Sequence, residues 1–138
     1  GLRNVLFLDP VPKTELVSIV DETDVGLGVL KDCPILDSIL SNKMFDFMAA
    51  GKPVVANLPG DMRAILEGER CGVYAPDMSP TGFADTMTAL SRTPKEELAA
   101  MGARGRVLAE TRYAREALLD DFEATLLAAI ARRKSEAA

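Results

Sequence analysis

The sequence predicts an α/β domain in which helices flank a parallel sheet and the C-terminal end is helical. Three observations support this fold class. Short apolar runs alternate with helical patterns through the first half of the chain. Glycine and proline residues mark the joins between these segments. From Ser79 onward, apolar residues recur only at helical spacing.

The composition fits one globular domain that binds neither nucleic acid nor metal. The chain has 138 residues, of which 48% are hydrophobic, enough to bury a core. Its formal net charge is −5, and it lacks the concentrated basic stripe of a DNA- or RNA-binding protein. It has no histidine, and Cys33 and Cys71 lie far apart, so we expect reduced, structural thiols and no zinc site. No run of about 18 apolar residues could span a membrane, and we expect a cytoplasmic protein.

The first β-α-β unit is predicted near the start of the chain. Residues 4–8 form a short apolar run, interpreted as a buried strand that ends in a loop with two prolines. A helix is predicted to begin near Lys13, where apolar residues recur at helical spacing. Residues 25–30 form a second apolar run, and their glycines suit a strand packed closely against another backbone.

A second β-α unit follows an irregular segment. Ser41 or Asn42 can cap a helix that runs through Ala50. Gly51 can end this helix because glycine readily adopts the left-handed conformation found there. Residues 53–56 then form a third apolar strand.

One more helix and strand complete the predicted sheet. Residues 61–67 form a short helix that closes near Gly68, and residues 71–74 form a fourth short strand. Strands that alternate with helices imply a sheet that is parallel and covered on both faces.

Helices alone are predicted after the sheet. Ser79 precedes Pro80, so Ser79 is predicted as an N-cap with proline at the first helical position. Thr93 and Glu96 have the spacing of a capping box at the start of the next helix. The final helix carries an apolar stripe, which we interpret as intramolecular packing rather than a groove for a partner. This stripe comprises Leu118, Leu119, Phe122, Leu126 and Ile130.

The helix that starts near Asn42 is a candidate anion site. Unpaired backbone N–H groups near Asn42, Lys43 and Met44 could hold a diphosphate, and the Lys43 ammonium adds a full charge. Asp46 lies one turn further along, on the same face as Lys43. Its carboxylate could accept hydrogen bonds from two adjacent ribose hydroxyls. The alternative is that Lys43 and Asp46 form only a surface ion pair, worth less than about 1 kcal/mol.

Two common catalytic motifs are excluded. Residues 51–53 read Gly-Lys-Pro, but a phosphate-binding loop needs a second glycine where Asp46 stands and Ser or Thr where Pro53 stands. A Ser-His-Asp or Cys-His arrangement cannot be built because the chain has no histidine.

Two long blocks of the sequence carry a family resemblance. The block SNKMFDFMAAGKPVVANLPGDMRAILEGERCGVYAP and the later block PKEELAAMGARGRVLAETRY resemble the C-terminal, nucleotide-sugar-binding half of retaining GT-B glycosyltransferases of the group 1 family. The segment NVLFLDPVPKTELVSIVDETDVGLGVL resembles the strand, loop and helix that precede this block in the family. The likeness covers nearly the whole chain and is greatest to bacterial members that assemble polysaccharides or surface glycans. It implies a partial Rossmann-like fold, with residues 1–138 as a donor-binding domain that lacks its first β-α portion and the N-terminal acceptor domain.

The resemblance also implies roles for individual residues. Backbone amides at Asn42 and Lys43 hold the donor diphosphate, and Asp46 binds the ribose. Ser38 stands where the family has an acidic contact to the donor sugar, and Gly60 matches a glycine near the donor cleft. The loop that lies against the nucleobase comprises Pro10, Val11 and Pro12.

Ser38 departs from the family pattern, which has a carboxylate at this position. Asp37 stands next to it, and a shifted loop could bring Asp37 to the donor sugar instead.

The resemblance implies transfer of a hexose-type sugar, with retention, from a nucleotide diphosphate sugar to a glycan or lipid-linked acceptor. The acceptor attacks from the front face while the leaving diphosphate is stabilised electrostatically, a step for which no metal or cofactor is expected.

The family's Arg and Lys pair at the pyrophosphate belongs to a region before Asn4. We therefore expect this polypeptide alone to bind donor weakly and to show no turnover. Contact with the inner face of a membrane is expected only through the full-length protein.

Two alternatives remain open. One is a non-catalytic binding or interaction module in which the half-sheet is a scaffold and the acidic surface docks a protein. Ser38 favours this alternative, whereas Asn42, Lys43 and Asp46 oppose it. The other is a different GT-B enzyme, such as a nucleotide-sugar epimerase, because a fold does not determine a reaction.

Overall fold

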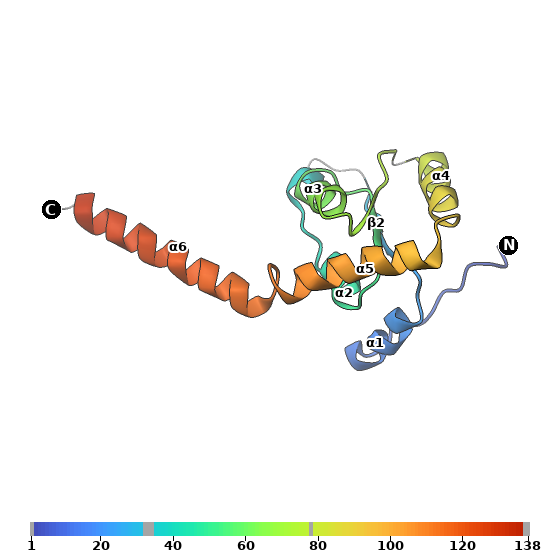
Figure 1. Cartoon of the computed structure of the whole chain (residues 1–138), viewed down its shortest axis with the longest axis horizontal. Coiled ribbons are helices and arrows are strands. Elements are labelled where there is room, and N and C mark those ends of the chain that lie inside the picture. The colour runs from blue at the N-terminus through green and yellow to red at the C-terminus, as the bar shows by residue number, and fades with distance from the viewer. Residues whose placement is uncertain (1, 32–34, 78, 137–138) are drawn as a thin grey trace.

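The computed structural model describes residues 2–31, 35–77 and 79–136. Most of the predicted helices and strands are present, and they follow one another along the chain as Figure 1 shows. In chain order they are α1 (Lys13–Asp21), β1 (Gly26–Gly28), the 3-10 turn η1 (Leu36–Ser38), α2 (Asn42–Ala49), β2 (Val54–Ala56), α3 (Asp61–Gly68), β3 (Gly72–Tyr74), α4 (Pro80–Leu90), α5 (Lys95–Glu110) and α6 (Arg115–Glu136).

The three strands form one parallel sheet in the order β1-β2-β3. In its central row, Leu27 pairs with Val55, and Val55 pairs with Val73. The chain passes from β1 to β2 through α2 and from β2 to β3 through α3. This topology confirms the predicted α/β class with a parallel sheet and flanking helices.

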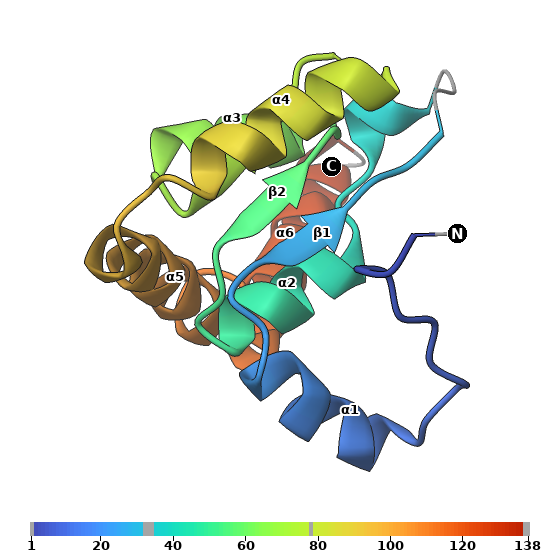
Figure 2. The ribbon, with the colours of Figure 1, turned by 90° about the vertical axis from the view of Figure 1, so that its right-hand side faces the viewer.

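The side chains of β2 alternate between the two faces of the sheet. Val54 packs in the larger core cluster with Met44 of α2, whereas Val55 packs on the other face with Leu90 of α4. Figure 2 shows α2 and α4 on opposite sides of the strands. Helices therefore cover both faces of the sheet, as predicted, although Leu27 on the edge strand β1 is 44% exposed.

α2 lies close to β1 because β1 contributes two glycines to the contact. The ring of Phe47 occupies the space that a Cβ on Gly26 would take. The end of the Met44 side chain does the same at Gly28, and Met44 is fully buried. The prediction that these glycines allow a close approach is confirmed, but they meet side chains of α2 rather than another backbone.

α5 contacts the end of α2 through three further glycines. Gly51 has a φ of 70°, and its N–H donates to the carbonyl of Met48 at 2.9 Å, which confirms that it ends α2. A Cβ on Gly102 would overlap the carbonyl oxygen of Gly51. Gly105, one turn further along α5, is buried beside Met48. These close contacts hold α5 against the helix that carries the candidate site.

The two predicted helix caps after the sheet have different outcomes. The Ser79 cap is confirmed, because the N–H of Gly82 donates to the Ser79 hydroxyl at 3.1 Å. The capping box of Thr93 and Glu96 is wrong. Pro94 occupies the N-cap position of α5 with an extended backbone, φ −55° and ψ 144°, and no side chain caps this helix. The helix therefore begins one residue later than a Thr93 cap requires.

The predicted strand at residues 4–8 is wrong. These residues lie outside regular secondary structure, and Leu6 and Phe7 are 80% and 91% exposed. Figure 1 shows the segment running apart from the sheet. An apolar run predicts a segment that packs against other apolar residues, but a strand also needs a hydrogen-bonded neighbouring strand. None of the described strands pairs with this segment.

The interpretation of the final helix as intramolecular packing is also wrong. α6 contains 22 residues, and none of them is buried. Figure 1 shows it extending away from the sheet and the other helices, and Phe122 at the middle of its apolar stripe is 62% exposed. Helical periodicity predicts an apolar face but cannot say what covers that face. Neither α6 nor any other helix of the described residues is long and apolar enough to cross a membrane.

Candidate functional site

The candidate site lies at the edge of the sheet where the strands end. β1 is followed by the loop that leads through η1 to α2, and β2 is followed by the turn that starts α3. Because the strands are parallel, their carboxyl ends share one edge, and helices that follow them begin there. Ligands bind at this edge in open α/β sheets.

The start of α2 presents exposed polar residues to solvent. Asn42 and Lys43 are both exposed. Ser41 has the extended backbone of an N-cap residue, as predicted, but its side chain makes no capping hydrogen bond. The N–H of Met44 donates to the Ser41 carbonyl at 2.9 Å, whereas no acceptor among the described residues is recorded for the amides of Asn42 and Lys43. Two N–H groups therefore remain available for an anion at this helix start.

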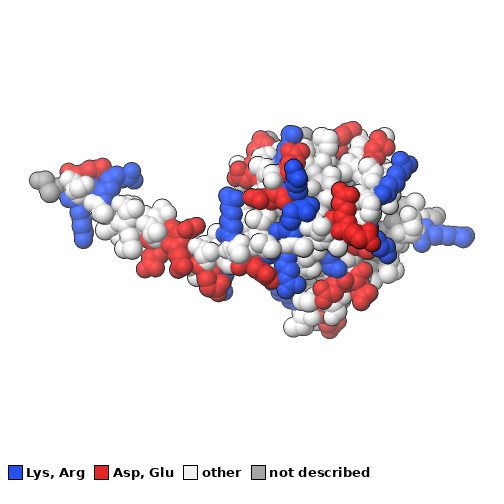
Figure 3. All heavy atoms as spheres, in the orientation of Figure 1, with Lys and Arg blue, Asp and Glu red and all other residues white. Residues whose placement is uncertain are grey.

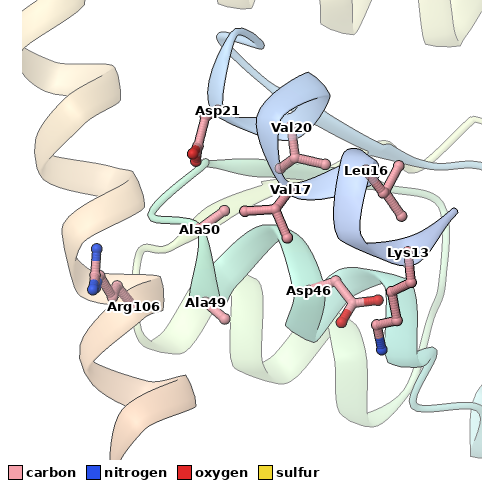
Figure 4. A pocket seen from close by; sticks show the side chains of 9 residues that line it. All are labelled: Lys13, Leu16, Val17, Val20, Asp21, Asp46, Ala49, Ala50 and Arg106. Carbon is pink, nitrogen blue, oxygen red and sulfur yellow. The ribbon is translucent and has the colours of Figure 1, made fainter. Parts of the chain in front are cut away.

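Asp46 lines a pocket between α1 and α2. The pocket has a volume of about 380 Å³. Figure 4 shows Asp46 and Lys13 together at one end, and Asp21 and Arg106 at the other. Between these ends the lining is apolar and comprises Leu16, Val17, Val20, Ala49 and Ala50. The lining thus combines a central apolar stretch with charged side chains at both ends.

Asp46 is not engaged in the surface ion pair with Lys43 that the sequence left open. The ion pairs among the described residues do not join these two side chains. Asp46 instead points into the pocket toward Lys13 of α1 (Figure 4). Its carboxylate is exposed, and nothing in the described part of the chain is recorded as a hydrogen-bond partner for it.

The structure places Gly60 against the backbone next to Ser38. Gly60 has a φ of 65°, and a Cβ there would overlap the carbonyl oxygen of Asp37. Only glycine combines this backbone conformation with so close an approach. The two residues expected near the donor cleft, Ser38 and Gly60, are therefore neighbours, and both Asp37 and Ser38 are exposed.

The loop expected to face the nucleobase comprises Pro10, Val11 and Pro12, and all three residues are exposed. The Pro12 carbonyl accepts hydrogen bonds from the N–H groups of Glu15 and Leu16, at 2.9 and 3.1 Å, and so starts α1. The next residue, Lys13, lines the pocket together with Asp46. The residue that follows this loop and the expected ribose ligand therefore line one pocket.

Comparison with known proteins identifies the family. A family model described as glycosyl transferase-like matches residues 1–122. The chain belongs to the glycosyl transferase-like family. A Bacillus subtilis (strain 168) protein named as a teichuronic acid biosynthesis glycosyltransferase, TuaH, is 37% identical over 59 residues, which cover 42% of this chain and 15% of that relative. The chain thus spans a small part of this relative's length. No solved structure matches the chain at a significant level.

All the candidate site residues of this glycosyl transferase-like chain lie in the matched region. The described residues contain no group of three or more His, Cys, Asp or Glu side chains placed to hold a metal ion.

Asn57 is a residue of the site edge that the sequence analysis did not single out. Its side chain is 1% exposed. The Asn57 Nδ2 donates to the Leu30 carbonyl at 2.8 Å, and the Leu30 N–H donates to the Asn57 Oδ1 at 2.9 Å. These bonds tie the segment after β1 to the end of β2. The sequence signal that could have identified Asn57 is a polar residue directly after the apolar run of β2.

We predict that Asn57→Ala lowers the free energy of unfolding by about 2 kcal/mol, because it leaves both backbone groups of Leu30 without their partner in a part-buried place. Chemical denaturation at a fixed temperature measures the change. Asn42→Ala is the matched control, since Asn42 is exposed. A difference of less than about 0.5 kcal/mol between the two variants, the range expected for surface substitutions, would contradict the role given to Asn57.

Two titratable groups near the strand ends have shifted pKa values. Hydrogen bonds from the Ser79 N–H and hydroxyl lower the pKa of Asp77, which follows β3. The ionised Asp77 thus favours the folded loop above its unfolded pKa, and this contribution is lost as pH falls through the folded pKa. Burial raises the pKa of the Cys71 thiol. Cys71 is free and buried, as expected for a structural thiol, whereas Cys33 lies outside the described residues.

Proposed function

We propose that this chain is the donor-binding part of a retaining GT-B glycosyltransferase of the group 1 type. The enzyme transfers a hexose-type sugar from a nucleotide diphosphate sugar to a glycan or lipid-linked acceptor, at the cytoplasmic face of a membrane. Membership of the glycosyl transferase-like family supports glycosyl transfer. The observation that carries the donor-binding role is that α2 joins two features. It starts with available amides at Asn42 and Lys43, and one turn later it directs Asp46 into a pocket.

In this proposal each end of the donor has its own ligands. The amides of Asn42 and Lys43 and the Lys43 ammonium hold the diphosphate, because a helix start carries roughly half a positive charge. Asp46 accepts hydrogen bonds from the ribose hydroxyls. The loop that ends at Pro12 contacts the nucleobase, and the neighbouring residues Ser38 and Gly60 border the donor sugar.

The same residues account for the chemistry of transfer. As the bond between the sugar and the diphosphate breaks, negative charge grows on the leaving diphosphate. Fixed N–H groups at the start of α2 and the Lys43 ammonium stabilise this charge in the transition state, which is the largest contribution that a prearranged site makes. An acceptor hydroxyl oxygen forms its bond to the anomeric carbon on the face from which the diphosphate leaves, and its proton passes to the leaving diphosphate. The anomeric configuration is therefore retained. The acceptor pocket belongs to another part of the protein.

Titration calorimetry of nucleotides with the chain tests donor binding. We expect UDP or GDP to bind at least about tenfold more tightly than the corresponding nucleoside, because the charges at the start of α2 act only on the diphosphate. Equal affinities for diphosphate and nucleoside would contradict the role of Asn42 and Lys43. No binding of any nucleotide would favour the alternative of a non-catalytic interaction module. The serine at position 38, where the family has a carboxylate, also favours this alternative. An epimerase of the same fold would also bind donor, and product analysis with the full-length protein distinguishes it.

A further inference from the structure

Lys13 and Asp46 face each other across one end of the pocket between α1 and α2. Figure 4 shows the Lys13 and Asp46 side chains close together, where they reach the same end of the pocket from the two helices. The ion pairs of the described residues do not join Lys13 to Asp46. Two opposite charges are thus held on either side of a gap.

The chemistry of these two groups restricts what can fill the gap. An ammonium has only hydrogen-bond donors, and an ionised carboxylate has only acceptors. A group that bridges them must accept from Lys13 and donate to Asp46 at once. A hydroxyl does both, whereas a carbonyl only accepts and an amide N–H only donates.

The other end of the pocket does not offer the same arrangement. Arg106 lines it opposite Asp21, but the Arg106 Nε donates to the Glu110 carboxylate at 2.7 Å. The stretch between the two ends is apolar. Lys13 and Asp46 thus form the charged pair of this lining in which, within the described residues, neither side chain is bound to another side chain.

We propose that Lys13 is a specificity-determining residue, which with Asp46 clasps the 2′-hydroxyl of the donor ribose. The proposal rests on the proposed function, in which Asp46 binds ribose. The Lys13 Nζ donates to the 2′ oxygen, and the 2′-hydroxyl donates to the Asp46 carboxylate. A 2′-deoxynucleotide leaves both side chains without this partner, and sites built around a substrate hydroxyl reject analogues that lack it. The chain therefore selects ribonucleotide donors over deoxyribonucleotide donors.

Titration of UDP and 2′-deoxy-UDP into the wild-type chain and into Lys13→Ala tests this selection. We expect the wild-type chain to prefer UDP by about tenfold, because hydrogen bonds to charged groups are the strong ones. Lys13→Ala should weaken UDP binding about fivefold, a moderate effect because both side chains are exposed to solvent. It should leave 2′-deoxy-UDP within about twofold of its wild-type affinity.

Two further variants complete the test. Lys95→Ala removes an exposed lysine of α5 that does not line this pocket, and it should change neither affinity. Lys13→Arg keeps the donors and should retain the preference for UDP. If Lys13→Ala weakens both nucleotides equally, Lys13 acts only as a general charge, and the proposal is overturned while nucleotide binding itself still supports the proposed function. If only GDP binds the wild-type chain, the same titrations are made with GDP and 2′-deoxy-GDP. If neither UDP nor GDP binds, the proposed function fails and this proposal fails with it.

Discussion

Asp46→Asn is expected to weaken binding of UDP or GDP by about tenfold or more. The carboxylate can accept hydrogen bonds from both ribose hydroxyls, whereas the amide offers one acceptor oxygen and carries no charge. Titration calorimetry at constant ionic strength measures the change. The substitution leaves the size of the side chain nearly unchanged, so the comparison isolates charge and hydrogen bonding.

The control for this prediction is Asp85→Asn. Asp85 lies on α4 and is exposed, like Asp46, so both variants lose the same surface charge. Both should melt within about 2 °C of the wild-type chain, since surface substitutions seldom change stability by more than about 0.5 kcal/mol. Equal nucleotide affinities for Asp46→Asn and Asp85→Asn would show that Asp46 does not bind the ligand.

Gly102→Ala is expected to lower the free energy of unfolding by about 2 kcal/mol or more. The added Cβ would overlap the carbonyl oxygen of Gly51, and a backbone atom cannot move aside as a flexible side chain can. The substitution therefore pushes α5 away from α2 and loosens the helix that carries Asp46. Urea denaturation followed by circular dichroism measures the loss.

Gly68→Ala is the matched control, because the same substitution meets no atom within 4 Å there. Gly68 is the last residue of α3, and alanine is favoured over glycine in a helix by up to about 1 kcal/mol. We expect Gly68→Ala to be neutral or stabilising. A loss of stability at Gly68 equal to that at Gly102 would mean that the contact with Gly51 does not decide the effect.

Local patterns in the sequence predicted the order of elements well, because each depends on neighbouring residues. The apolar run around Val55 and the break at Gly51 were sufficient to locate β2 and the end of α2. The Ser79 cap was predictable because its hydrogen bond joins residues three apart. The box at Thr93 failed because the backbone of Pro94 stays extended, and a spacing rule does not contain backbone angles.

Long-range partners could not be predicted in the same way. The apolar residues around Phe7 and Phe122 correctly mark apolar segments, but they stay exposed in the described structure. Periodicity reports that a face is apolar and not which element meets it. Two predictions failed for this one reason, namely the strand at residues 4–8 and the buried stripe of α6.

The candidate site also combines residues that a local pattern could predict with residues that it could not. Asn42, Lys43 and Asp46 share one helix, so their spacing offered a common site, with a surface ion pair of Lys43 and Asp46 as the alternative. Lys13 comes from α1 and reaches the pocket of Asp46 only through the packing of two helices distant in sequence. Asn57 likewise meets Leu30 across 27 residues of chain. Such pairs can be recognised only from the fold, because no local sequence pattern contains both residues.

Amide NMR spectra of the isotope-labelled chain during titration with UDP or GDP test the donor site most directly, because they map nucleotide binding residue by residue. We predict that the largest shifts occur at Asn42, Lys43 and Asp46, with Lys13 shifting as well. Shifts confined to α4 and the loop before it, or an unchanged spectrum with both nucleotides, would contradict a donor site at the start of α2.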